Sequence, residues 1–444
     1  MLRIVHDRDE AEAELRRIGD RYRSDYVLHA CATVREVLAS VRRNGDQALL
    51  HYTASVDRVT LSPSELRVTG SELDAAYQQV NKDLLDAIFL ASSQIEAFHR
   101  QRVPSSWVQF KDLDVVLGKR YQPVEKAGIY VPGSGGGPER GAAYPSRVLM
   151  NAIPAKVAGV RRTIMSTPPG PDKKINPAVL VAAQSAGIQE VYRVSGAAAI
   201  GAFAYGTETI PPVDVIVGTG NIYVTLAKKL VSPIVGIDCL TGAGELLIIA
   251  DRLANHEHVA ADLLAQAERD PMASAILLTP DLTLATLVTA EVDRQLINHS
   301  RRLLTSKAIA HYGLVVVVES ELMAAELANA FAPQNLMLQV ADPWSLLEEI
   351  RHAGAIFLGY SSPIALGDYL AGPNQNLPTN GAARYASSLG VETYLKHSNI
   401  IHYSPEALKK VADAIDLLAQ AEGFPYHADS VRLRTEGQRD KYDI

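Results

Sequence analysis

The sequence predicts an α/β protein in which two parallel-sheet layers are flanked by helical segments at both ends of the chain. Three observations lead to this fold class. The chain has 444 residues, of which 47% are apolar, enough for more than one buried core. Strand-like and helix-like segments alternate from about residue 121 onward, and a second alternating set follows residue 238. Short apolar strands that alternate with helices are typical of a buried parallel sheet.

The first hundred residues are predicted to be helical. Residues 9–18 are rich in helix-forming side chains, and Ser71 is a plausible N-cap for a further helix. At the other end of the chain, residues 405–423 are predicted to form an amphipathic helix.

The first alternating set is expected to form one sheet. The predicted strands cover residues 128–133, 162–166, 190–194 and 213–217, and the predicted helices cover 148–158, 177–186 and 197–205. In the second set, strands are predicted at 245–250, 274–279, 313–319 and 355–358, with helices at 259–268 and 282–298.

Composition excludes several classes of protein. The net charge of -7 provides no general attraction for nucleic acid or anionic lipid. Two cysteines, Cys31 and Cys239, exclude a disulfide framework and indicate a reducing compartment. The N-terminus lacks the apolar core of a signal peptide, and no apolar run reaches the length of a membrane span. We therefore expect a soluble cytoplasmic protein that binds neither nucleic acid nor membrane.

Two glycine-rich turns follow predicted strands. The loop at 133–137 has the sequence Gly-Ser-Gly-Gly-Gly, and a second turn covers 217–221. Glycine permits close approach to phosphates, yet neither spacing matches a Rossmann fingerprint or a P-loop, and glycine is equally common in plain connectors. Two such turns at the carboxyl ends of strands in one sheet would frame a ligand cleft.

Short motifs in a fixed order make the chain resemble the histidinol dehydrogenase family. They are 128–133 (GIYVPG), 206–209 (GTET), 220–225 (GNIYVT), 236–238 (GID), 264–268 (LAQAE), 367–369 (GDY), 377–379 (LPT) and 387–390 (SSLG). The resemblance covers nearly the whole chain.

This resemblance implies an enzyme that oxidises an amino alcohol to an amino acid with two NAD, through an aldehyde and beside a zinc ion. It also implies a homodimer of two related Rossmann-like domains, with swapped terminal segments and the active site at the dimer interface. Residues 1–120 would hold the N-terminal helical segment and the start of the first α/β domain. Residues 121–237 would form the second, NAD-side domain, 238–385 the remainder of the first, and 386–444 a swapped helical tail.

The NAD-contacting positions are partly retained. By resemblance, Tyr130 and Asn221 stand at cofactor-contact positions, although a tyrosine such as Tyr130 is also a common packing residue. The third position is a glutamine in the family and Ala198 here, which has no side chain for that hydrogen bond. We expect NAD as the cofactor.

The zinc shell departs from the family pattern. Gln266, Asp368 and His427 match three family ligands, but Arg269 stands where the family has a histidine. A guanidinium has no lone pair for a metal and repels a cation. We therefore expect no tight zinc site. Three hypotheses remain for Arg269: it replaces zinc as the local cation and pairs with Asp368, it binds an anionic substrate group, or it points to solvent.

The substrate pocket and the acid–base pair are also changed. Gly244 and Gln375 stand at a family serine and a family histidine, while Glu422 and His427 match the family. Gln334 and Asn335 replace the family Glu-His pair that moves protons, and side-chain amides cannot do so.

These departures suggest that the substrate is not histidinol. The first hypothesis is an NAD-linked dehydrogenase for another amino alcohol or related alcohol, with His427 as its base. The alternative is a catalytically silent homologue that binds a ligand or partner. An authentic histidinol dehydrogenase of histidine biosynthesis is the third hypothesis.

Overall fold

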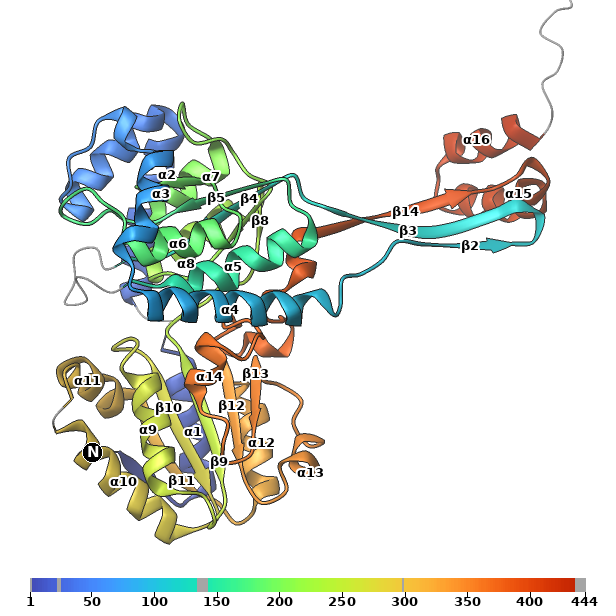
Figure 1. Cartoon of the computed structure of the whole chain (residues 1–444). Helices are drawn as coiled ribbons and strands as arrows, with labels where there is room; N and C mark the ends of the chain where they lie inside the picture. Colours follow the sequence, from blue (N-terminus) through green and yellow to red (C-terminus); the bar gives the residue numbers. More distant parts are fainter. Residues whose placement is uncertain (1, 22–24, 134–142, 298, 436–444) are drawn as a thin grey trace, which may run out of the picture. The chain divides into compact units, whose positions relative to one another are not determined.

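A computed structural model describes residues 2–21, 25–133, 143–297 and 299–435. The chain divides into two compact units, which we describe separately (Figure 1). Unit 1 comprises Met1–Arg102 and Val124–Tyr394, and unit 2 comprises Val103–Pro123 and Leu395–Ile444. Apart from Gly133, the glycine-rich loop at 133–137 lies outside the described residues.

The larger sheet of unit 1 has six parallel strands in the order β1-β11-β10-β9-β12-β13. The strands are β1 (Arg3–Val5), β9 (Glu245–Ala250), β10 (Ser274–Thr279), β11 (Gly313–Val317), β12 (Asn335–Gln339) and β13 (Ala355–Leu358). Its helices are α1 (Arg8–Gly19), α9 (His256–Ala267), α10 (Leu282–Leu296), α11 (Arg302–Tyr312), α12 (Glu321–Phe331), α13 (Pro343–Leu347) and α14 (Ile364–Tyr369).

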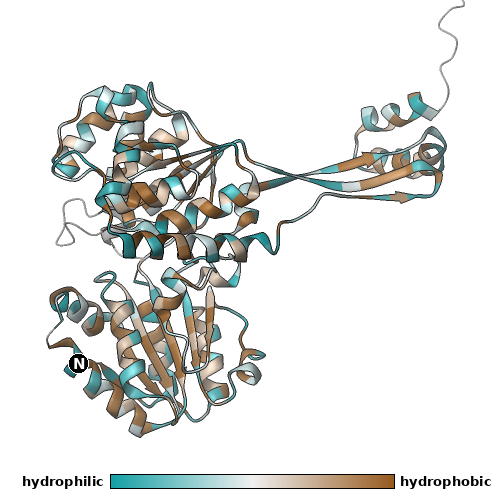
Figure 2. Cartoon of the chain, in the orientation of Figure 1, coloured by the Kyte–Doolittle hydropathy of each residue, from teal (hydrophilic) through white to brown (hydrophobic). Residues whose placement is uncertain are grey.

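Helices cover both faces of this sheet because its central strands are apolar on both sides. In β9, Leu246 and Ile248 belong to the core layer beneath α9 and α10. Leu247 and Ile249 belong to the opposite layer, beneath α1 and α12. Successive strand residues point to opposite faces, so a continuous apolar run requires a helix layer on each side. Figure 2 shows the apolar residues concentrated along these strands.

The second sheet of unit 1 has five parallel strands in the order β6-β5-β4-β7-β8. The strands are β4 (Lys126–Tyr130), β5 (Arg162–Ser166), β6 (Glu190–Tyr192), β7 (Val215–Val217) and β8 (Gly236–Ile237). The helices of this part are α2 (Asp25–Tyr52), α3 (Gly70–Gln79), α4 (Lys82–Arg100), α5 (Pro145–Ala158), α6 (Pro177–Ser185), α7 (Gly196–Tyr205) and α8 (Ile222–Val231). The predicted α/β fold with two parallel sheets is thus confirmed.

One predicted helix start is wrong. Thr69, not Ser71, caps α3: its side chain accepts from Glu72 N, and the Glu72 carboxylate accepts from Thr69 N at 2.9 Å. This reciprocal capping box satisfies two backbone donors, whereas Ser71 lies within the first turn.

Unit 2 contains a three-stranded antiparallel sheet in the order β14-β3-β2. Its elements are β2 (Trp107–Lys111), β3 (Val115–Pro123), β14 (Leu395–His402), α15 (Pro405–Ala421) and α16 (Pro425–Thr435). Throughout the described part of the chain, no helix is both long and apolar enough to cross a membrane.

Candidate active site

Gln334 and Asn335 lie at the amino end of β12, directly beside the start of β9. Gln334 Oε1 accepts from Glu245 N at 3.0 Å, and Gln334 N donates to Glu245 Oε2 at 3.2 Å. Asn335 Nδ2 donates to Glu245 O at 3.1 Å. Both amide side chains are buried, with 6% and 5% exposure. Their hydrogen bonds therefore join the two strand ends, and neither amide supplies a group that accepts a proton near neutral pH.

Glu245 is the anion at the centre of this edge, and sequence reasoning missed it. Its Oε1 accepts from Arg21 Nη2 at 3.0 Å and from Asn380 N at 3.1 Å. Both side chains of the Arg21–Glu245 pair are 1% exposed. Burial raises the pKa of Glu245, and the charge of Arg21 opposes that rise. A carboxylate at the start of a predicted strand that is otherwise apolar was the available signal.

Arg21 is held by backbone carbonyls as well as by Glu245. It donates to Ile18 O at 2.8 Å, to Met272 O at 3.0 Å and to Ala243 O at 3.1 Å. The guanidinium thus joins the end of α1 to the starts of β9 and β10. No local pattern around residue 21 marks this role, because all of these partners except Ile18 lie more than two hundred residues away.

Arg269 and Asp368 form an ion pair near the same end of the sheet. Arg269 Nη1 donates to both carboxylate oxygens of Asp368, at 2.8 and 2.9 Å. Arg269 follows α9 and Asp368 lies in α14, two elements packed together. The two side chains are 23% and 20% exposed. Of the three hypotheses for Arg269, the structure therefore shows the pairing with Asp368.

This arrangement does not fit a zinc ion. Both oxygens of Asp368 already accept from a cation. A +2 ion about 4 Å from the guanidinium would be repelled by about 8 kcal/mol at an effective dielectric constant of ~20. Among the described residues, no group of three His, Cys, Asp or Glu side chains that could hold a metal includes Asp368.

Gly244 leaves room for the side chain of Gln266. A Cβ at residue 244 would lie 2.2 Å from Gln266 Nε2 and 3.3 Å from Gln334 Oε1. Gln266 is fully buried, and neither of its amide atoms has a hydrogen-bond partner among the described residues. Buried amides are normally paired, so this one is positioned for a group that binds from outside the chain or for water.

Gln375 has a second unpaired amide group. Its Nε2 is buried and has no hydrogen-bond partner in the described part of the chain. The flanking asparagines are fixed: Asn376 N donates to Asn374 Oδ1 at 2.8 Å, and Asn374 Nδ2 donates to Met150 O. The backbone on both sides of Gln375 is therefore held by hydrogen bonds, and its Nε2 is a donor without a partner among the described residues.

The cofactor-side residues meet at the carboxyl ends of two paired strands. Tyr130 ends β4, and its buried hydroxyl accepts from Gly196 N, at the start of α7, at 3.1 Å. Burial raises the pKa of Tyr130 to about 12. Asn221 caps α8 by accepting from two backbone N–H groups, and Ala198 is buried in α7. Both polar side chains thus hold helix starts in place at this edge.

The second glycine turn requires glycine at residue 218. Gly218 has φ +114°, and a Cβ there would lie 2.0 Å from Tyr130 O. Its N–H donates to Asp238 Oδ2 at 2.9 Å, while the buried Lys228 donates to Gly218 O at 2.8 Å and pairs with Asp238. A buried charge pair thus fixes the turn.

Asp57 lies beside the start of α7 and was not found from the sequence. Ser195 Oγ donates to Asp57 Oδ2 at 2.6 Å. Burial raises the pKa of Asp57 to about 6. No motif surrounds this residue, which ends a short π-helix, Thr53–Asp57.

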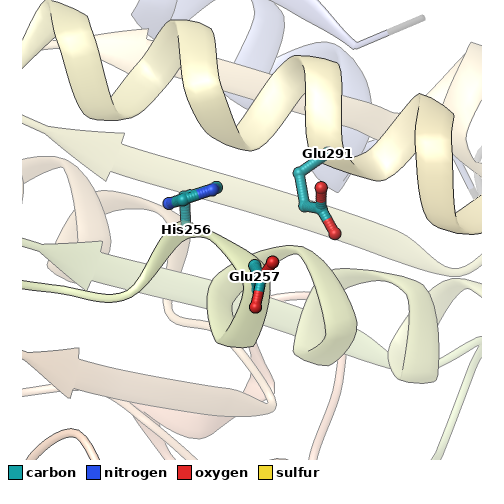
Figure 3. Close-up of side chains that lie close together, drawn as sticks. All are labelled: His256, Glu257 and Glu291. Atoms are coloured by element: carbon teal, nitrogen blue, oxygen red, sulfur yellow. The ribbon is translucent and has the colours of Figure 1, made fainter.

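A further group of possible metal ligands lies elsewhere in unit 1. His256, Glu257 and Glu291 place ligand atoms within 4.8 Å of one another (Figure 3). Glu291 is already paired with the Arg294 guanidinium, at 2.6 and 2.7 Å, and accepts a hydrogen bond from Gln295. These hydrogen bonds lower the pKa of Glu291 to about 2. The group is therefore accounted for by an ordinary ion pair.

Two predicted site residues belong to unit 2. Glu422 is the exposed C-cap residue that follows α15, and His427 is exposed in α16, with its ring 5.1 Å from that of Phe424.

Comparison with known proteins identifies relatives over almost the full chain. "Histidinol dehydrogenase 2" of Trichormus variabilis is 67% identical over 98% of this chain and 99% of its own length. Histidinol dehydrogenase of Synechococcus sp. is 64% identical over the same shares. A crystal structure of histidinol dehydrogenase from Elizabethkingia anophelis matches with a TM-score of 0.89 and 33% identity, covering 98% of each chain.

These relatives contradict the prediction of a substrate other than histidinol, and with it the hypothesis of a silent homologue. Five relatives that carry the name histidinol dehydrogenase are 58–67% identical over 98% of this chain. The prediction gave decisive weight to a few altered side chains. The amides of Gln334 and Asn335 keep the starts of β9 and β12 joined, and the fold matches that of a histidinol dehydrogenase.

The family model for histidinol dehydrogenase matches residues 21–435. Together with the relatives, the match shows that this chain belongs to the histidinol dehydrogenase family of NAD-dependent oxidoreductases.

Proposed function

We propose that this chain oxidises histidinol to histidine with NAD, in the biosynthesis of that amino acid. The observation that carries the proposal is the identity of 58–67% to five histidinol dehydrogenases over 98% of the chain. In the first step the alcohol carbon gives a hydride to NAD and the hydroxyl gives up its proton, which yields an aldehyde. In the second, the hydrated aldehyde gives a hydride to a second NAD, which yields the carboxylate.

NAD would bind at the edge where β4 and β7 end. Glycine at 218 lets the backbone pass close to Tyr130 at that edge, and the N-termini of α7 and α8 favour negative charge. Tyr130 and Asn221 hold these two helix starts. The substrate's polar groups would meet the unpaired amides of Gln266 and Gln375.

The proton acceptor would come from unit 2 of a second copy of this chain. Glu245 is saturated by its donors, and the Gln334–Asn335 pair cannot accept a proton. His427 is exposed, and an imidazole exchanges protons near neutral pH. We assign His427 the role of base and Glu422 the binding of the substrate ammonium group.

Unit 2 also supports a homodimer. Its buried apolar residues, among those described, are Val115, Ala407, Ala419 and Ala428. Large apolar side chains are exposed on the same unit: Trp107, Val108, Phe110, Ile401, Leu417, Leu418, Phe424, Tyr426 and Leu433. Figure 2 shows apolar stretches along its strands. Three buried alanines and a valine are too small a core for an independent unit, so this surface would be covered by a second copy.

The activity is tested by measuring NADH formation by the tag-free, full-length protein with histidinol and NAD. Histidinol should yield two NADH per molecule, and amino alcohols without an imidazole should yield less. Failure of folded protein to form NADH from histidinol would refute the proposal. The same chain should restore growth without histidine to bacteria that lack this enzyme.

The shared site is tested by mixing two inactive variants. Asp368→Asn disables the part of the site in unit 1, and His427→Gln disables the part in unit 2. When the two variants are denatured and refolded together, about half of the dimers should contain one chain of each, and each of these should have one intact site. About a quarter of wild-type activity should therefore return in a symmetric dimer. Absence of recovery would mean that each tail serves its own chain. Ile401→Glu should yield monomers in sedimentation, whereas Leu303→Glu, on an exposed position of unit 1, should not.

A further inference from the structure

The Arg269 guanidinium is the fixed positive charge of this site. Both of its contacts with Asp368 use Nη1, which leaves Nε and Nη2 outside that ion pair. Among the described residues, no other group accepts from the Arg269 side chain. With 23% of its side chain exposed, Arg269 is accessible to a small molecule.

Gln266 lies three residues before Arg269, at the end of α9, and its amide is fully buried and unpaired. The amide lies against Gly244, where any side chain would collide with it at 2.2 Å. Its position therefore depends on glycine at 244. Two features thus lie three residues apart in the chain: a cation paired with Asp368, and a neutral amide in the space that glycine leaves, without a hydrogen-bond partner among the described residues.

We propose that the Arg269–Asp368 ion pair takes the place of a metal ion, so that this protein works without zinc and binds the reacting oxygen of its substrate through arginine N–H groups. Asp368 fixes the guanidinium, Arg269 donates to the alcohol oxygen and later to the aldehyde oxygen, and the Gln266 amide accepts or donates beside it. A fixed cation stabilises negative charge that develops on that oxygen as the proton leaves. This inference rests on the proposed oxidation of histidinol.

Metal content tests the inference independently of activity. Tag-free protein is incubated with excess zinc chloride, freed of unbound metal and analysed by mass spectrometry for zinc per chain. The wild type should hold far less than one zinc per chain. Arg269→His removes the cation and adds an imidazole ligand, so this variant should take up zinc toward one per chain.

The matched control is Arg252→His, which adds a histidine at an exposed position and leaves Asp368 paired. It should hold no more zinc than the wild type. About one zinc per wild-type chain, lost in Asp368→Asn, would overturn the inference. So would failure of Arg269→His to gain zinc, because Arg269 would then not be what excludes the metal.

Kinetics separate this inference from the proposed function. NADH formation from histidinol by the wild type should be insensitive to EDTA. Arg269→Gln should lower kcat by on the order of 10²-fold. Arg269→Lys should lower kcat less, because it keeps a cationic donor. Inhibition by EDTA that zinc reverses would overturn the metal-free site and leave the function intact. A metal-free protein that forms no NADH would refute only the function.

Discussion

The buried pair of Arg21 and Glu245 allows a quantitative prediction for the variant Arg21→Met. Methionine keeps the apolar volume of the side chain but removes the charge. Glu245 would then remain buried with only the backbone donors of Gln334 and Asn380. Breaking a buried ion pair from one side costs about 3–5 kcal/mol, because the remaining charge has lost its compensation.

At ~2–4 °C per kcal/mol, this cost corresponds to a fall in Tm of roughly 6–20 °C. The sign of the pH dependence follows from Glu245. Burial already raises its pKa, and loss of Arg21 removes the main opposing influence. A carboxyl group whose pKa is raised in the folded state contributes stability below its unfolded pKa and loses it as the pH rises through the folded pKa. Arg21→Met should therefore be closest to wild type at acidic pH.

The assay is urea denaturation followed by circular dichroism at pH 5 and pH 8, with thermal melting as a second measurement. Arg21→Met/Glu245→Gln is the informative companion, because it removes both charges. It should recover part of the loss, with an interaction energy of about 1–3 kcal/mol. The reasoning fails if Arg21→Met unfolds within about 1 kcal/mol of wild type at pH 8, a change typical of an ordinary point substitution.

Three further outcomes are expected. Gln334→Glu places a second carboxyl group against Glu245, so the pKa of the new carboxyl group should be raised. The variant should be less stable to urea at pH 8 than at pH 5, and its rate of NADH formation should change with pH as this group titrates. Burial raises the pKa of Asp57 from 3.8 to about 6, so the wild type loses stability as the pH rises between these values. Asp57→Asn should remove this pH dependence and, in the same urea assay, stabilise the protein at pH 7 by at most about 3 kcal/mol. Gly218→Ala should weaken NAD binding, measured by calorimetry, and cost about 1–3 kcal/mol or more, because its Cβ would meet Tyr130 O at φ +114°; unchanged affinity would show that this turn does not bind the cofactor.

Local sequence predicted the interior strands well. Strands β9 and β10 have the bounds that their largely apolar runs predict, because a strand buried on both faces needs apolar residues on both. Strands β5 and β13 also have the predicted bounds, although both are only partly buried. Strand β12 was missed, since it begins at Asn335 and ends at Gln339, both amides. Strands β3 and β14 were missed for another reason: β3 pairs with a segment more than 270 residues away, and neither strand has a continuous apolar run.

The site was predictable only as a set of positions. Motif order located Gln266, Arg269 and Asp368, and side-chain chemistry allowed three hypotheses for Arg269. Spatial proximity decided among them, because the ion pair joins residues 99 positions apart. Likewise, only the three-dimensional structure shows that a Cβ at residue 244 would lie 2.2 Å from Gln266 Nε2, so that Gln266 in this position requires glycine there.

Apolar periodicity and short motifs thus established the α/β class, the family and the positions that depart from its pattern, because these depend on residue type and on neighbours in sequence. Tertiary structure decided which charges meet and which polar groups remain unpaired. Arg21 reaches Glu245, Arg269 reaches Asp368 and the Gln266 amide is left free, because folding brings together strand and helix ends that are remote along the chain.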